Sequence, residues 1–312
     1  MKISLRQLQY FQALCRHGHF GHAAAASNVS QPALSVKIQE LETLLGKSLV
    51  NRDMRPFCPT PFGYEVLASA NRILADIQSI EDSARQHRGV EGPFHLGIIP
   101  TVAPYLLPVA IRLIQASLPK LDLQIREATT DELLDEINHG QLDAGIIATD
   151  VAASSLTQRP LFQDRFLLAV QASQSKALNL KDGEIVFEDI APLKFLLLAE
   201  GHCLRDKTKS FCKYATQETL NQIGASSLHT LAGLVAGGYG TTLLPEIAFA
   251  DTEGRSELAI LQLADPSPER TISLVIKSQN EASMNIAKLE RILIEAGTQK
   301  IKETRAKLSA RG

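Results

Sequence analysis

The sequence is poor in cysteine, with four among 312 residues, and it has no long hydrophobic run. No apolar stretch approaches the roughly 20 residues that a helix needs to cross a bilayer, so we expect no membrane contact. Residues 1–7 lack the apolar core of a signal peptide, and we therefore expect a cytoplasmic protein. Disulfides in that compartment are usually transient and redox-active, which argues against a permanent structural disulfide. No cysteines have zinc spacing, so no metal or cofactor is predicted.

An excess of either charge is also lacking, since 32 Lys and Arg nearly balance 34 Asp and Glu and the formal net charge is only −2. This value hides an asymmetry between two parts of the chain. Residues 1–90 carry 10 Lys and Arg against 7 Asp and Glu, whereas the remainder carries 22 against 27. A basic N-terminal part on an acidic body is typical of a DNA-binding head joined to another domain. The length itself suggests two or three domains.

The first 60 residues predict a winged helix-turn-helix. Apolar residues recur at three-residue steps from Leu5 to Leu14, which indicates one buried helical face, and Gly18 ends that helix. A short alanine-rich helix follows. Ser30 is a good N-cap for a third helix, which ends at Gly46. Residues 49–57, interrupted by prolines, predict a two-stranded wing.

The exposed side of the third helix and the wing carry the candidate DNA-binding residues. Short or polar side chains are what a helix in the major groove needs, and guanidinium groups in a wing hold phosphates. The candidates are Ser30, Gln31, Pro32, Ser35, Lys37 and Gln39 in the helix, with Arg52 and Arg55 in the wing. Taken singly, each of these residues fits a solvated helix surface equally well.

Residues 61–87 predict one long helix with the seam of a two-stranded coiled coil. Apolar residues alternate steps of four and three along it: Val66, Ala70, Ile73, Ile77, Ile80 and Ala84. A monomer would leave this stripe in water, so the pattern predicts a homodimer. Glycines at 89 and 92 then mark a hinge to the rest of the chain.

The rest of the chain alternates short strands and helices, which favours parallel sheets with covering helices. Expected strands are 94–99, 121–127, 142–148, 166–170, 195–198, 241–244, 258–263 and 271–277. Expected helices are 104–117, 131–139, 228–236 and 282–296. The glycine-rich turn at 237–240 does not fit a phosphate loop, and we expect it to let the chain turn tightly into a strand.

Two cysteines nine positions apart are the strongest chemical signal. Cys203 stands between His202 and Leu204-Arg205-Asp206, and Cys212 follows. If residues 203–212 form a helix, the two Cα atoms lie roughly 13 Å apart at 1.5 Å per residue, whereas a disulfide needs about 7 Å or less. Joining them requires unwinding, as in a redox switch. The alternative is that both are buried as small hydrophobic residues.

The motif Gly201-His202-Cys203-Leu204-Arg205-Asp206 resembles the peroxide-sensing OxyR branch of the LysR-type transcription regulators. The stretches Ile99-Pro100-Thr101 and Ser30-Gln31-Pro32-Ala33-Leu34-Ser35 resemble it as well, and the likeness covers nearly the whole chain. One departure is His22, where such heads often carry arginine, so a phosphate contact there would be weaker and pH-dependent.

This resemblance implies an α/β protein with a winged helix-turn-helix head at 1–60, a linker helix at 61–90 and a regulatory domain at 91–312. The regulatory domain would comprise two subdomains like those of periplasmic binding proteins, 91–165 with 266–302, and 166–265. The expected partners are operator DNA, hydrogen peroxide, RNA polymerase and further copies of the chain, as a homodimer or homotetramer.

Strand ends are expected to bring the sensing residues into one cleft, where a peroxide meets a thiolate and hydrogen-bond donors. We expect Thr101, Thr130 and His202 to supply donors, and by resemblance Arg270, while Arg205 and Asp206 fix the loop of Cys203. His202 alone is more often structural, and Thr101 could be a helix cap. Two other functions stay open: a LysR-type regulator of a small metabolite with incidental cysteines, and a thiol peroxidase, which would have no use for a recognition helix.

Overall fold

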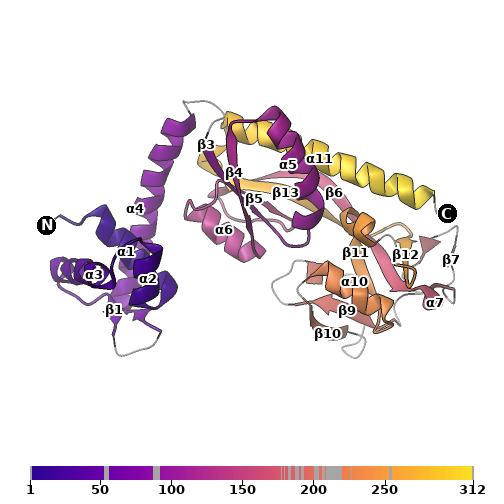
Figure 1. Ribbon diagram of the computed structural model, residues 1–312, viewed down its shortest axis with the longest axis horizontal. Coiled ribbons are helices and arrows are strands. Elements are labelled where there is room, and N and C mark those ends of the chain that lie inside the picture. Colours follow the sequence, from indigo (N-terminus) through magenta and orange to yellow (C-terminus); the bar gives the residue numbers. More distant parts are fainter. Residues whose placement is uncertain are drawn as a thin grey trace. The chain divides into compact units, whose positions relative to one another are not determined.

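The computed structural model describes residues 2–310 except 53–55, 87–91, 177, 179, 182–183, 187–189, 191–192, 200–203, 206–207, 209–219, 226 and 253–254. Only the backbone is described at 75, 78–79, 81–86, 180–181, 220–224 and 251. The chain divides into two compact units, Met1–His87 and Arg88–Gly312, and each is considered by itself (Figure 1).

The first unit, called the head, is a helical domain with a small wing. Its elements are α1 (Leu5–His17), α2 (Phe20–Ala26), α3 (Gln31–Leu45), the antiparallel pair β1 (Val50–Asn51) and β2 (Cys58–Pro59), and α4 (Pro61–Gln86). Gly18 and Gly46 end α1 and α3 in the left-handed conformation, with φ of 59° and 69°. Such a conformation favours glycine because it has no Cβ. The predicted helices, their caps and the wing are therefore confirmed.

The beginning of α4 is built into the head. Ala70 is fully buried in the same core as Phe11 and Leu34, and Val66 packs against that core. The Gln12 side-chain amide donates a 2.8 Å hydrogen bond to Asn71. Farther along, Ile80 is exposed in the single chain. The predicted coiled-coil seam thus begins with residues that serve the head's own core, and its exposed part follows them.

The second unit, called the regulatory unit, combines a mixed sheet with covering helices. Its main sheet runs in the order β4-β3-β5-β13-β6-β12-β8-β7, with β11 also paired to β6. The strands are β3 (Gly92–Ile98), β4 (Leu121–Glu127), β5 (Ala144–Ile147), β6 (Leu156–Gln171), β7 (Leu180–Lys181), β8 (Glu184–Ile185), β11 (Thr242–Pro245), β12 (Leu258–Leu263) and β13 (Glu269–Lys277). A separate parallel pair is formed by β9 (Phe195–Leu198) and β10 (Leu220–Ala225).

Helices and short 3-10 segments complete the regulatory unit. They are α5 (Ala103–Ser117), α6 (Thr130–Asn138), α7 (Ala172–Ser175), α10 (Leu228–Ala236), η2 (Glu246–Thr252), η3 (Ser278–Asn280) and α11 (Met284–Ser309). The turn before β11 is as tight as its glycines predict: a Cβ on Gly240 would lie 2.6 Å from the Lys194 carbonyl oxygen.

The expected parallel sheets are found in only part of the regulatory unit. Strands β3, β4 and β5 are parallel, but β11, β12 and β13 all run antiparallel to β6. Strands β12 and β13 run in the same direction, on opposite sides of β6 and along successive parts of it, so the five residues between them are enough to connect them. Strand β6 begins at Leu156, ten residues before its predicted start. It pairs with β13 up to Arg165 and with β11 from Phe166 onward.

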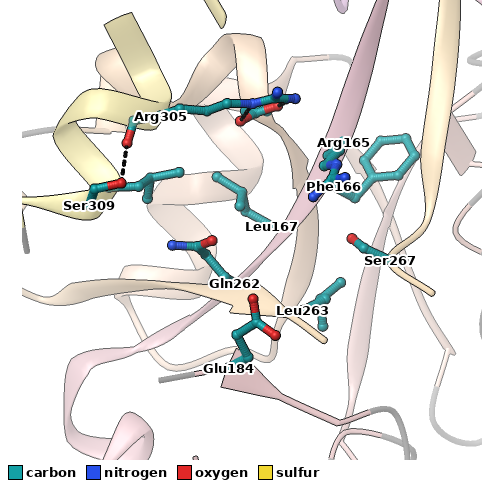
Figure 2. Close-up of a pocket in the computed structure, with 11 residues that line it drawn as sticks. Arg165, Phe166, Leu167, Glu184, Gln262, Leu263, Ser267, Arg305 and Ser309 are labelled. Atoms are coloured by element: carbon teal, nitrogen blue, oxygen red, sulfur yellow. Dashed lines mark hydrogen bonds and ion pairs between the residues drawn. The ribbon is translucent and has the colours of Figure 1, made fainter. Parts of the chain in front are cut away.

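Helix α11 ends at Ser309, well beyond its predicted end at residue 296. Its last turns lie against η2 and β6 (Figure 1). Arg305 donates from Nε to the carboxylate of the buried residue Glu246 at 2.7 Å. Beside this pair is a cavity of about 220 Å³ (Figure 2), which Arg165 and Glu184 also line. Among the described residues, no helix is long and apolar enough to span a bilayer.

Candidate functional site

Two parallel strands place the predicted threonines at the same edge of the sheet. Strands β3 and β4 pair along their whole lengths, and the Ala128 N–H after β4 donates to the Ile98 carbonyl at the end of β3. Thr101 follows β3 and is 2% exposed. Thr130 follows β4 as the first residue of α6. The carboxyl ends of neighbouring parallel strands are where ligands bind in α/β folds.

A buried arginine holds Thr101. The Arg270 Nη1 group donates to the Thr101 hydroxyl oxygen at 2.9 Å, and Nη2 donates to the Thr101 carbonyl at 3.2 Å. The side chain of Arg270 is 0% exposed and lies over the Phe166 ring. Because the Thr101 oxygen accepts this hydrogen bond, its own O–H proton is oriented to donate elsewhere. Arg270 thus orients a donor, a role that the sequence did not predict.

Asp164 completes this arrangement, and sequence reasoning missed it. Its carboxylate accepts from Arg270 Nε at 2.9 Å and from the Ile247 backbone N–H at 3.0 Å, and its side chain is 0% exposed. Burial raises the pKa of the Asp164 carboxyl, while the Arg270 guanidinium and the Ile247 N–H oppose this rise. A buried ion pair of this kind is stable only when both partners are present. Asp164 and Arg270 therefore form one structural unit with Thr101.

The Thr130 hydroxyl, unlike that of Thr101, is not held by a hydrogen bond from a described residue. Its oxygen is buried and has no hydrogen-bond partner among the residues that the structure describes. The preceding residue, Thr129, caps α6 and donates its backbone N–H and its hydroxyl to Glu132, which lowers the pKa of that carboxyl. The Thr130 hydroxyl is not used in this cap. A buried hydroxyl without a partner costs about 1–3 kcal/mol, so a small polar ligand would relieve that cost.

The segment that contains the two cysteines is described only in part. His202, Cys203, Asp206 and Cys212 lie outside the described residues. Arg205 is buried, and its Nη1 group donates to the Leu198 carbonyl at the end of β9 at 2.9 Å. The Thr208 hydroxyl donates to the Leu204 carbonyl. Arg205 is therefore placed where it ties this segment to the end of a strand.

The exposed surface of α3 carries most of the predicted DNA-binding residues. The Ser30 hydroxyl caps the helix through the Ala33 N–H at 3.4 Å, and Pro32 stands in the first turn. Gln31, Pro32 and Gln39 are exposed and Ser35 is half-buried. The core side of the same helix is formed by Leu34, Ile38 and Leu41, which are fully buried.

Two of the predicted cations are paired within the head. Lys37 binds Glu40 at 2.8 Å, and Arg52 binds Glu42 at 2.7 Å. Glu42 also accepts the Leu49 N–H at 2.8 Å, so it links α3 to the start of the wing. DNA phosphates would have to compete with these carboxylates for Lys37 and Arg52. Arg55 lies outside the described residues.

The described part of the chain contains no metal cluster, and burial makes the Cys15 thiol unreactive. No group of three or more His, Cys, Asp or Glu side chains is arranged there to hold a metal ion. Burial raises the pKa of the Cys15 thiol to about 12, so this cysteine stays protonated, as expected of a filler on α1. The Cys58 thiol donates to the Pro56 carbonyl.

Comparisons with known proteins agree on both units. Residues 5–64 match the model described as a bacterial regulatory helix-turn-helix protein of the lysR family, and residues 87–298 match the LysR substrate binding domain. The chain is 37% identical over 277 residues to the DNA-binding transcriptional dual regulator OxyR of Escherichia coli K12, which covers 88% of this chain and 90% of that protein. It is 36% identical to the hydrogen peroxide-inducible genes activator of Dickeya chrysanthemi, with the same coverage of both chains.

Solved structures give the same result. A full-length Pseudomonas aeruginosa OxyR carrying a cysteine-to-aspartate substitution has a TM-score of 0.71 and 29% identity, covering 95% of each chain. A cysteine-to-serine mutant of Corynebacterium glutamicum OxyR with bound hydrogen peroxide has a TM-score of 0.65 and 30% identity, covering 98% of this chain and 96% of that one. The chain therefore belongs to the LysR family of bacterial helix-turn-helix regulators, in the branch of the hydrogen peroxide-inducible genes activators.

Proposed function

We propose that this chain is a transcription regulator that binds operator DNA and senses hydrogen peroxide through Cys203. The Cys203 thiolate attacks one peroxide oxygen, the O–O bond breaks, and hydroxide leaves as Cys203 becomes a sulfenic acid. The Cys212 thiol then attacks the Cys203 sulfur and releases water, which leaves a disulfide. The electrons come from the two thiols, and peroxide is the oxidant.

The observation that carries this proposal is the pair of threonine hydroxyls at the ends of β3 and β4. The Arg270–Asp164 pair orients the Thr101 hydroxyl, and the buried Thr130 hydroxyl lacks a partner among the described residues. Two hydroxyl donors at one sheet edge suit a ligand as small as peroxide, whose leaving oxygen needs hydrogen bonds as negative charge develops. Thr101, Thr130 and His202 are assigned to this role.

Two alternative functions predict different experimental results. A regulator that binds a metabolite at the same edge would respond normally without Cys203. A thiol peroxidase would consume peroxide repeatedly in the presence of a thioredoxin-type reductant, whereas a sensor turns over slowly and stays oxidised. The head, with its capped α3, favours regulation over turnover.

Mass spectrometry of the full chain tests the redox chemistry. Reduced protein treated with about one equivalent of peroxide should acquire a Cys203–Cys212 disulfide, and Cys212→Ser should leave a sulfenic acid on Cys203 that a dimedone probe traps. Cys15→Ser is the matched control and should oxidise normally. Thr130→Val, which replaces only the hydroxyl, should slow the oxidation. A Cys203→Ser chain that still switches its DNA complex with peroxide would refute the proposal.

The DNA-bound state is proposed to be a homodimer joined through the exposed part of α4, which pairs further into a homotetramer and contacts RNA polymerase. Oxidation would rearrange residues 203–212 and change the spacing of the heads. Footprints of the reduced and oxidised chain on one operator should then differ in length or phase.

A further inference from the structure

A valine, and not only the polar candidates, lies on the side of α3 that faces away from the head's core. Val36 is 52% exposed, although a valine gains from burial. At 100° per residue, it lies about 160° around the helix from both Leu34 and Ile38, which are fully buried. Pro32 and Gln39, one turn away on either side, are also exposed. Val36 is therefore at the centre of the outward surface.

Three other exposed aliphatic side chains of the head have a different environment. Ile3, Leu5 and Ile73 together line an apolar groove between the N-terminal segment and α4. Val36 is not part of this groove. Its sequence neighbours on α3 are Ser35 and Lys37, and Lys37 forms an ion pair with Glu40. Val36 is thus an exposed apolar group that lies one turn from Pro32 and Ala33 on one side and from Gln39 and Glu40 on the other.

We propose that Val36 reads the 5-methyl group of a thymine in the major groove. This rests on the proposed role of α3 as the recognition helix. Among the base edges in the major groove, the thymine methyl is the group that an apolar side chain without donors or acceptors can recognise. The neighbouring Gln39 amide matches the N6 and N7 atoms of adenine. Pro32, Val36 and Gln39 together select A·T pairs at one part of each half-site.

The test uses the full-length chain and duplexes that it selects from a random library. Each thymine of the selected site is replaced in turn by deoxyuracil, which removes only the 5-methyl group. Wild-type protein should lose about fourfold in affinity per half-site at one position, as expected for exposing one methyl-sized group. Val36→Ser should bind thymine and deoxyuracil there equally well.

Thr43→Ala is the matched control, because Thr43 is exposed on the same side of α3 near its C-terminal end. This variant should keep the full methyl effect. Equal thermal midpoints of all variants would show that the head stays folded. If no thymine shows a methyl effect that depends on Val36, the proposal is overturned while DNA recognition stands. A wild-type chain that selects no sequence overturns both the recognition function and this proposal.

Discussion

Replacing Asp164 by Asn tests whether the buried pair with Arg270 stabilises the sheet edge that carries Thr101. The substitution keeps the size of the side chain and an oxygen that can accept the Ile247 N–H. It removes the negative charge beside a guanidinium that has no access to solvent. Breaking a buried ion pair on one side costs about 3–5 kcal/mol, because the remaining charge is left uncompensated. The regulatory unit should therefore lose that much free energy of unfolding.

Hydrogen exchange of the full chain, read by mass spectrometry, measures this loss separately in each unit. With 1.4 kcal/mol for each factor of ten, the most protected amides of β13 should exchange about 10²- to 10⁴-fold faster. Peptides from α1, in the head, should not change. The double variant Asp164→Leu with Arg270→Met should regain most of the protection, because both charges are absent. It should nevertheless oxidise slowly with peroxide, since Thr101 has lost its donor.

A small effect would refute this interpretation. If Asp164→Asn exchanges within threefold of the wild type, the pair does not stabilise the edge. If the double variant reacts with peroxide as fast as the wild type, the hydrogen bond from Arg270 to Thr101 has no part in sensing.

The other predictions concern single contacts. His22→Arg should add one lasting phosphate contact, so DNA affinity should rise and the slope of log affinity against log salt should steepen by about 0.9; an unchanged slope would exclude the contact. Cys15, whose pKa is raised to about 12, should resist maleimide labelling at pH 7.5 in the native chain and react in urea, whereas equal rates would show that the thiol is accessible. Gly297→Ala should cost about 1–3 kcal/mol in the unfolding free energy of the regulatory unit, because its Cβ would clash with the Phe162 ring. The added Phe162→Leu change should recover part of this loss.

Much of the head was predictable because its signals are local. Capping by Ser30, the glycines at 18 and 46 and the spacing of apolar residues each act within one or two turns of helix. These signals predict the helices almost residue by residue. The environment of Ala70 was not predictable in this way, because the heptad pattern does not reveal whether a residue packs within its own chain or against a partner.

The regulatory unit departs from prediction where contacts are distant in sequence. The early part of β6 contains Arg159 and Asp164, whose polar character hides a strand, and their partners Glu290 and Arg270 lie more than a hundred positions away. The end of α11 is similarly rich in charge, yet Ile301 and Leu308 are buried there. Thr101 and Thr130 were predictable from the strands that precede them. Asp164 was not predictable, because its role follows from its contact with Arg270, which is distant in the sequence.

The attachment of α4 to the head has a mechanical consequence. Ala70 is buried in the core that α1 and α3 share, and Asn71 accepts a hydrogen bond from α1. Helices α3 and α4 therefore move together as one rigid body. A helix of 26 residues is about 39 Å long at 1.5 Å per residue. If α4 rotates by about 5° about one of its ends, the other end moves by about 3.4 Å, which equals the rise of one base pair. A change of about 5° in the direction of α4 therefore corresponds to a shift of the head by one base pair.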